Sequence, residues 1–341
     1  MRTQNFVSQV YGVAIATSLP IALVALSPVV AEAIGFTNLY VFGDSLSDTG
    51  NLYRATGNLI PPPPYFNGRL SNGPLWVEYL APKLNLTYTP QTNFAFAGAT
   101  TGTLNTTLPG GVPGLQQEVN LFTTLNPVAD PTALYIVWSG ANDYLGGKQQ
   151  NPAIPVSNLS TAIQSLAGVG AKNIVVANLP DLGKLPGTIA NPQASAGLTA
   201  LSGAHNSFLA QTLSLLSPSL SPSGVNLIPL DVNALFNDAL TNPAKYGFTN
   251  TTESCISPPP LLNPGVVPTV CSNPREYVFW DDIHPTTATH AFIGELAFET
   301  VSNSQAIPEP SAVAGLFIAG AFVSLKALQQ RQRQKAVKIE L

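Results

Sequence analysis

The run LYVFGDSLSDTGN at residues 39–51 decides the fold, because an unbroken apolar segment meets a polar turn that begins with glycine. Leu39–Phe42 has the continuous apolar character of a strand buried on both faces of a parallel sheet. Ser45 is the third residue after this segment. Ligands of open α/β sheets bind at the carboxyl ends of the strands. The run therefore predicts a buried first strand that presents a candidate nucleophile at its end.

Strand-like and helix-like segments alternate along the rest of the chain. Apolar runs predict further buried strands at residues 133–138, 173–177 and 225–230. Helical spacing of apolar residues predicts helices at 76–82, 159–166 and 198–216, and one that begins after Pro285. Pro82 is expected to end the first of these helices. This alternation indicates an α/β class with a parallel sheet of about five strands in a three-layer α/β/α arrangement.

A second polar segment, which begins at Asp281, supplies two more reactive groups. A serine hydroxyl needs an adjacent general base, and a carboxylate must orient that base. His284 lies three residues after Asp281, whereas His205 and His290 lie in helix-like runs without an acid at that spacing. The chain thus offers Ser45, Asp281 and His284 in that order. Taken singly, a Gly-Asp-Ser turn is common in loops, and an Asp-x-x-His pair is more often structural.

Four blocks in order resemble the GDSL, or SGNH, family of esterases and lipases. They occupy residues 43–47, 93–99, 140–143 and 281–285, and the resemblance extends over roughly residues 37 to 302. It implies the flavodoxin-like three-layer fold of that family. It also implies hydrolysis of carboxylic esters through an acyl-enzyme, with the catalytic residues Ser45, Asp281 and His284.

The resemblance also implies an oxyanion hole. Acyl transfer builds negative charge on the carbonyl oxygen, and each preorganised donor lowers the barrier by about 3 kcal/mol. The implied donors are the backbone N–H groups of Ser45 and Gly98 and the side-chain amide of Asn142. Many relatives have two glycines in the second block, whereas Ala97 precedes Gly98 here. This departure leaves the choice of the oxyanion glycine open.

Three acidic residues near the blocks have two interpretations. Asp44, Asp48 and Asp143 can be drawn around a cation, but their spacing matches no calcium loop. For Asp44 and Asp48, the simpler role is to hydrogen-bond the turn that holds Ser45. The chain has no Cys/His zinc spacing and no phosphate-binding loop motif. We therefore expect neither a metal nor a cofactor.

Residues 1–33 have the pattern of a secretory signal peptide. Arg2 precedes a largely apolar stretch at 10–30, and Ala31–Ala33 offers a small-x-small cleavage site. The apolar stretch is long enough that an uncleaved anchor stays open as an alternative. The pattern predicts an exported protein whose hydrolase domain occupies residues 34–306.

Residues 307–341 resemble the PEP-CTERM sorting signal of exopolysaccharide-producing Gram-negative bacteria and cyanobacteria. Pro308–Pro310 reads Pro-Glu-Pro, and a mostly apolar run at 311–325 precedes a basic stretch. The resemblance implies export and sorting machinery as partners, with transient membrane association and cutting near the Pro-Glu-Pro. A short membrane anchor is the alternative. In either case the catalytic domain is expected at the cell surface, in the periplasm or outside the cell.

Cys255 and Cys271 are the only cysteines in the chain. In an exported protein a disulfide is the favoured interpretation, and two unpaired thiols are the alternative. Closing a loop of this size stabilises a protein by about 3 kcal/mol in the chain-entropy model. We expect the bond to rigidify the segment that carries Asp281 and His284.

Composition and loops leave the natural substrate open. Charged residues are 9% of the chain and the net charge is −4, which does not suggest a nucleic-acid partner. A lipid or other small ester, or an acylated polysaccharide, is the expected substrate. A polysaccharide O-acetyl esterase, an acyltransferase and a non-catalytic surface module remain alternatives. Pro61–Pro64 with Tyr65 and Phe66 form a rigid loop, and whether it borders the substrate cleft is left open.

Overall fold

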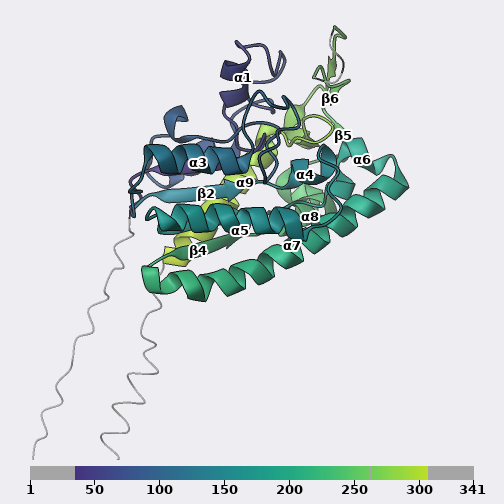
Figure 1. Cartoon of the computed structure of the whole chain (residues 1–341). Coiled ribbons are helices and arrows are strands. Elements are labelled where there is room, and N and C mark those ends of the chain that lie inside the picture. The colour runs from purple at the N-terminus through teal and green to yellow at the C-terminus, as the bar shows by residue number, and fades with distance from the viewer. Residues whose placement is uncertain (1–34, 262, 264, 306–341) are drawn as a thin grey trace, which may run out of the picture. The chain divides into compact units, whose positions relative to one another are not determined.

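A four-stranded parallel sheet lies at the centre of the computed structural model, which describes residues 35–261, 263 and 265–305 (Figure 1). The strands are adjacent in chain order: β1 (Leu39–Gly43), β2 (Leu134–Trp138), β3 (Asn173–Ala177) and β4 (Asn226–Leu230). Outside β1, Phe94 N–H donates to the Val41 carbonyl at 2.7 Å and Phe96 N–H to the Gly43 carbonyl at 3.0 Å. This short added segment completes the strand order 2-1-3-4-5 of a flavodoxin-like sheet.

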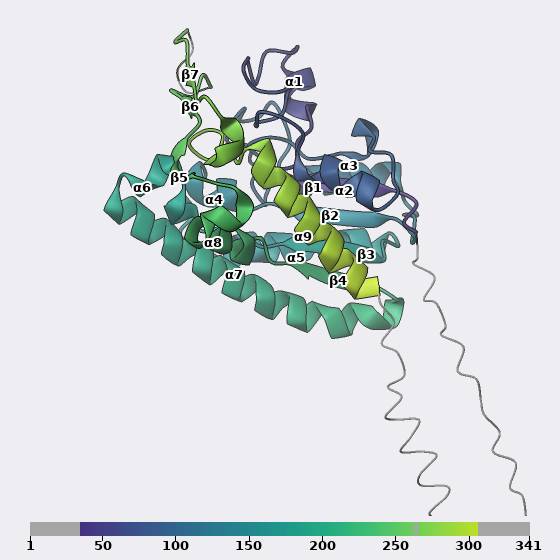
Figure 2. The same ribbon diagram turned by 180° about the vertical axis from the view of Figure 1, so that it is seen from behind.

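Helices cover both faces of the sheet. The helices in front in Figure 1 are α3 (Leu115–Leu125), α5 (Ala153–Gly168) and α7 (Pro192–Leu220). The opposite face, seen in Figure 2, carries α2 (Trp76–Lys83), α8 (Val232–Thr241) and α9 (Thr287–Gln305). Short helices α1 (Asn51–Ala55), α4 (Ala141–Leu145) and α6 (Pro186–Ile189) lie in connections. The predicted three-layer fold is confirmed, although α2 continues one residue beyond Pro82.

The central strand β2 shows why the layers form. All five of its residues are buried. Tyr135 and Val137 pack in one apolar cluster with α3, α5 and α7, whereas Leu134, Ile136 and Trp138 pack in another with α2, α8 and α9. Alternate side chains point to opposite faces of a strand, so a continuous apolar run needs a helical layer on each face.

A pair of small sheets precedes α9 and was not predicted from the sequence. In one, β5 (Asn250–Ser254) pairs with β8 (Tyr277–Phe279), and in the other β6 (Ile256–Ser257) pairs with β7 (Thr269–Val270). A disulfide joins Cys255 to Cys271 beside β6 and β7. Cys255 N–H donates to the Phe279 carbonyl at 3.1 Å, and Ile256 N–H to the Trp280 carbonyl at 2.8 Å. The disulfide-linked hairpin is therefore hydrogen-bonded to the chain that enters Asp281.

The predicted signal peptide and sorting tail, residues 1–33 and 307–341, lie outside the described residues. Within the part of the chain that the structure describes, no helix combines the length and apolar character needed to cross a membrane.

Candidate active site

The turn after β1 is shaped by a close approach of two strands. Gly43 has a φ of 149°, and a Cβ there would lie 2.1 Å from the Trp138 carbonyl oxygen of β2. Only glycine fits this position. The Asp44 carbonyl then accepts the N–H groups of Ser47 and Asp48 at 3.0 and 2.9 Å. The chain reverses at once beyond the sheet edge, which leaves Ser45 at the carboxyl end of β1.

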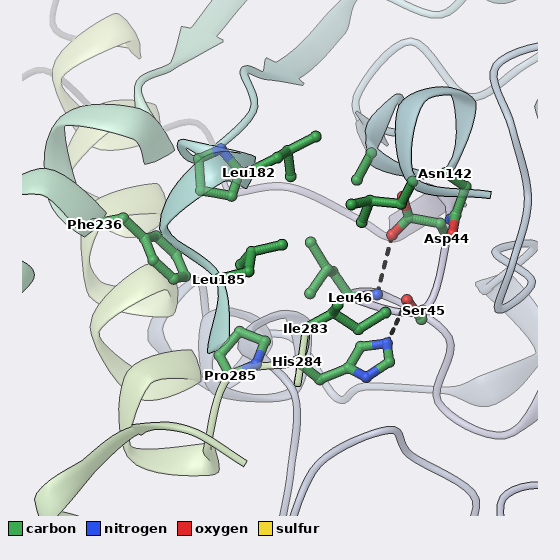
Figure 3. A pocket seen from close by; sticks show the side chains of 13 residues that line it. Asp44, Ser45, Leu46, Asn142, Leu182, Leu185, Phe236, Ile283, His284 and Pro285 are labelled. Carbon is green, nitrogen blue, oxygen red and sulfur yellow. Dashed lines mark hydrogen bonds between the residues drawn. The ribbon is translucent and has the colours of Figure 1, made fainter. Parts of the chain in front are cut away.

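The structure brings Ser45, His284 and Asp281 into one hydrogen-bonded chain. His284 Nε2 lies 2.9 Å from Ser45 Oγ, and its Nδ1 lies 2.9 and 2.8 Å from the two carboxylate oxygens of Asp281. Figure 3 marks the contact between His284 and Ser45 with a dashed line. A carboxylate at Nδ1 selects the tautomer with its proton there. The lone pair of Nε2 then faces the Ser45 hydroxyl, which is the geometry that a general base requires.

Asp281 is buried yet ionised. Burial raises its pKa, but the facing His284, the Tyr65 hydroxyl and the Ile283 N–H outweigh this effect, so the pKa of Asp281 lies below its ordinary value. Ile283 N–H and His284 N–H donate to Oδ1 at 2.9 and 2.7 Å. Tyr65 O–H donates to Oδ2 at 2.6 Å. These donors replace the water that a buried carboxylate loses.

Two backbone N–H groups beside Ser45 have no acceptor among the described residues: those of Ser45 and Gly98. Gly98 has a φ of 85°, and a Cβ there would lie 2.3 Å from Thr107 Oγ1. The N–H of Ala97 donates to Asp48 Oδ2 at 2.8 Å. Because the Ala97 N–H is already used, Gly98 is the residue of the second block that has a backbone donor to offer.

Asn142 lines the same cleft from the first turn of α4. Its Nδ2 donates to the Ala99 carbonyl at 3.1 Å, and Thr106 Oγ1 lies 3.5 Å from its Oδ1. An amide nitrogen carries two hydrogens, so one N–H of Asn142 remains for a ligand. Ser45, Gly98 and Asn142 therefore bring three hydrogen-bond donors to one cavity.

Two hollows meet at Ser45 and His284. The larger, of about 340 Å³, lies beside Gly98, Asn142 and Asp281 and is walled by Tyr65 and Ile60. The proline-rich loop thus borders the cleft. The smaller, of about 30 Å³, has a mostly apolar wall that includes Leu145. Figure 3 shows other members of this wall: Leu46, Leu182, Leu185, Phe236 and Ile283. The smaller hollow has room for only a small group, so the larger one is the space for the bulk of an ester bound at Ser45.

Buried acids hold the blocks together, in agreement with the simpler interpretation of Asp48. Its carboxylate accepts the N–H groups of Gly50, Asn51, Leu52 and Ala97. Asp143 accepts the N–H and hydroxyl of Thr101 at 2.9 and 2.7 Å. Glu118, on α3, accepts Gly43 N–H at 2.8 Å and Phe96 N–H at 3.2 Å. The nucleophile turn, the Gly98 loop and α4 are therefore tied to one another.

Burial also changes how these acids ionise. It raises the pKa of Asp44 to about 7, against the opposing effects of Leu46 N–H and His284. It raises the pKa of Glu118 well above its ordinary value, and the pKa values of Asp48 and Asp143 are raised for the same reason. Partial protonation of Asp44 at neutral pH reduces the negative charge beside Ser45, where an oxyanion would form.

Sequence reasoning missed Glu118 and the contact of Tyr65. Glu118 had a signal, because it is three residues after Leu115 on the apolar stripe that continues through Val119 and Phe122. An acid on the buried face of a helix needs buried partners. The Tyr65–Asp281 contact had no signal in the sequence, since 216 positions separate the two residues.

Among residues 35–305, apart from the two undescribed positions 262 and 264, no group of three or more His, Cys, Asp or Glu side chains is placed to hold a metal ion. Asp44, Asp48 and Asp143 are instead occupied by backbone and hydroxyl donors.

The chain matches the model of the GDSL-like lipase/acylhydrolase family over residues 39–297. It is 31% identical to a phosphatidylcholine-sterol acyltransferase of Aeromonas hydrophila, in a match that covers 81% of this chain and 94% of that protein. It is 30% identical to a thermolabile hemolysin of Vibrio parahaemolyticus, where the match covers 76% of this chain but only 63% of the hemolysin. The structure of an aryl esterase of M. smegmatis matches 78% of this chain and 98% of its own, with 15% identity and a TM-score of 0.46.

Proposed function

Because the chain belongs to the GDSL-like lipase/acylhydrolase family, we propose that it cleaves carboxylic esters through an acyl-enzyme formed on Ser45. As a member of this family it is a hydrolase of ester bonds. The proposal adds the residues and their roles. The observation that carries it is the continuous hydrogen-bonded chain from Ser45 Oγ through both ring nitrogens of His284 to Asp281.

The first half-reaction acylates Ser45. Its Oγ attacks the ester carbonyl while His284 Nε2 takes the hydroxyl proton. Asp281 stabilises the imidazolium and keeps the ring aimed at Ser45. The N–H groups of Ser45 and Gly98 and the free N–H of Asn142 receive the developing oxyanion. His284 then returns the proton to the leaving alcohol, and the C–O bond of the ester breaks.

The second half-reaction returns the enzyme. Water enters the position of the departed alcohol, and His284 Nε2 takes one of its protons as the water oxygen attacks the acyl carbon. The same three donors hold the second oxyanion. Collapse of this intermediate restores the Ser45 hydroxyl with the proton from His284 and releases the carboxylic acid.

Acyl transfer to an alcohol acceptor is the second candidate function. The relative named phosphatidylcholine-sterol acyltransferase matches this chain over 94% of its own length, which favours it. The larger cleft beside Tyr65, of about 340 Å³, has room for an acceptor that competes with water for the acyl group. Product analysis with and without an added alcohol distinguishes the two functions, because transfer yields a new ester whereas hydrolysis yields only acid.

We also propose that the protein is exported, with residues 1–33 as the signal and residues 307–341 as the sorting tail. The Cys255–Cys271 disulfide in the described domain supports this proposal, because such bonds persist in oxidising compartments. Amino-terminal sequencing of the protein from its native membrane and medium fractions tests it. A mature chain that starts at Ile34 supports export, and an intact Met1 start in the cytoplasm contradicts it.

The experiment that tests the catalytic proposal is hydrolysis of a series of p-nitrophenyl esters, from acetate to palmitate, by the purified protein and its Ser45→Ala variant. Turnover should fall to near background in the variant at every chain length. Full activity of Ser45→Ala would remove Ser45 from the mechanism. The preferred chain length separates short-chain acetyl esters from lipid substrates, a choice that the sequence leaves open.

A further inference from the structure

Tyr65 reaches the carboxylate of Asp281 from a distant part of the chain. Its hydroxyl donates to Asp281 Oδ2 at 2.6 Å, although 216 positions separate the two residues. The Tyr65 side chain is buried, and its ring packs edge-on against the Trp280 ring, with 6.3 Å between the ring centroids. Its N–H donates to the Pro62 carbonyl at 3.2 Å. The hydroxyl is therefore held in place by both its ring and its loop.

The two oxygens of Asp281 are held by different means. Oδ1 accepts two backbone N–H groups from its own turn, those of Ile283 and His284. Apart from the imidazole itself, Tyr65 is the one donor to Oδ2 among the described residues. If the Tyr65 hydroxyl is lost, Oδ2 keeps only the ring that it is meant to orient. The carboxylate can then rotate about its Oδ1 bonds, and the imidazole follows.

We propose that Tyr65 is a positioning residue for the reaction: its O–H holds Asp281 Oδ2, so that Asp281 in turn holds His284 against Ser45. This inference rests on the proposed function of the three residues and adds a fourth side chain that acts through one of them. Tyr65 contacts none of the reacting atoms by this account. A charge-assisted hydrogen bond of this kind is stronger than one between neutral groups.

Tyr65 also belongs to the wall of the larger cleft, together with Ile60 and Leu70. The same side chain therefore bounds the substrate space and steadies the catalytic carboxylate. A role in binding alone would change KM, whereas a role in orienting His284 changes kcat. The two roles are separable because the hydroxyl donates to Asp281, and a substitution that removes only the hydroxyl keeps the ring.

Several titratable groups face the Asp281–His284 pair. Burial together with Asp281 and Asp282 raises the pKa of Tyr65 far above its ordinary value, so the phenol stays a donor throughout an assay. Burial lowers the pKa of His290, on α9, to about 3, so this ring stays neutral. Asp44, with a pKa raised by burial to about 7, does titrate in the assay range. Because the wild-type protein and a Tyr65 variant both keep Asp44, its titration contributes to both pH profiles and does not account for a difference between them.

The test compares Tyr65→Phe with the full-length wild-type protein, using p-nitrophenyl ester hydrolysis from pH 5 to 9. Tyr65→Phe keeps the ring and deletes the donor. We expect kcat to fall by about tenfold with KM within about twofold. The acid limb of the kcat/KM profile should move to higher pH by about half a unit. Without the Tyr65 hydrogen bond, the negative charge of Asp281 stabilises the protonated His284 ring more strongly. The matched control is Tyr135→Phe, a buried tyrosine whose hydroxyl donates to the Asp130 carbonyl at 2.8 Å.

A second variant should move the acid limb of the kcat/KM profile in the opposite direction. Fluorotyrosine at position 65 is a stronger donor than tyrosine, so the acid limb should move to lower pH. The fluorotyrosine variant also tests the positioning role if Tyr65→Phe does not fold. In an Asp281→Asn background, Tyr65→Phe should have no further effect on kcat, because the residue acts through that carboxylate.

Each failure points to a different claim. An unchanged kcat and pH profile in Tyr65→Phe, beside an inactive Ser45→Ala, overturns the positioning role alone. A tenfold loss that persists in the Asp281→Asn background, or a change confined to KM, also overturns it. Activity retained by Ser45→Ala overturns the proposed function and this inference with it.

Discussion

The nucleophile turn and the acid–base segment meet at one hydrogen bond, but they are built differently. The nucleophile turn, residues 43–52, is held by buried carboxylates that accept backbone N–H groups, four at Asp48 and one at Glu118. The acid–base segment, residues 277–285, is held by its small strand β8, a disulfide-linked hairpin and the Tyr65 hydroxyl.

The difference separates two tasks. Carboxylates that collect backbone N–H groups fix the path of the main chain, which a nucleophile at a strand end requires. In the acid–base segment, two backbone N–H groups of its own turn and the Tyr65 hydroxyl instead fix the orientation of the Asp281 carboxylate, and through it that of the His284 imidazole. Substitutions in the nucleophile turn, other than at Ser45 itself, should therefore act mainly on stability. Substitutions in the acid–base segment should act mainly on rate.

Asp281→Asn is the largest expected effect and the sharpest test of the second region. An amide at this position offers N–H to His284 Nδ1 and favours the wrong tautomer, so kcat should fall by about 10⁴-fold. The free energy of unfolding, measured in urea, should change by far less than the activation free energy that corresponds to this loss of rate. An Asp281→Asn variant whose kcat lies within tenfold of the wild-type value would show that Asp281 does not set the tautomer of His284.

Asp48→Ala is the corresponding test of the first region. It leaves four buried or half-buried N–H groups without their acceptor, which should cost about 4 kcal/mol of unfolding free energy. Asp181→Ala is the matched control, because among the described residues its carboxylate accepts only Gly183 N–H and the Thr199 hydroxyl. Equal losses in the two variants, measured by urea unfolding, would contradict the account.

These two predictions also mark what the sequence can and cannot reveal. Ser45, Asp281 and His284 are visible in the chain because their chemistry requires those residue types near strand ends and turns. The parallel sheet is visible because strands buried on both faces are apolar throughout. The Tyr65 contact is invisible, since it depends on how two distant loops pack. In the small sheets, β6, β7 and β8 have only two or three residues each, and β5 has no buried residue, so none of them gives a periodic signal.

Replacing Cys255 and Cys271 together by serine tests what supports the acid–base segment. Loss of this cross-link should lower the unfolding free energy by about 3 kcal/mol. The hairpin is hydrogen-bonded to Phe279 and Trp280, just before Asp281, so kcat should also fall, by less than in Asp281→Asn. Calorimetry of the wild-type protein with and without a reductant gives the same comparison. No change in either quantity would show that β8 and the Tyr65 hydroxyl support the segment without the disulfide.

The smallest expected effect is a pH dependence of stability carried by His290. Burial lowers its folded pKa to about 3, below the ordinary 6.5. The unfolded chain therefore binds more protons than the folded one between these values, and this contribution to stability is lost as pH falls below 6.5. The stability advantage of the wild type over His290→Gln should narrow between pH 7 and pH 5, by at most about 1.4 kcal/mol per pH unit. If the unfolding free energies of the wild type and His290→Gln, measured in urea, differ by the same amount at every pH in this range, His290 is not buried in its neutral form.

The two regions act together to make Ser45 a nucleophile through His284. Intact-mass measurement after treatment with a p-nitrophenyl alkylphosphonate tests it most directly, because the phosphorus stays on the attacking oxygen as p-nitrophenol leaves. We expect one phosphonyl group per wild-type chain, mapped to Ser45 by peptide mass, none on Ser45→Ala and very slow labelling of His284→Ala. A phosphonyl group on another residue, or equally rapid labelling of His284→Ala, would contradict it.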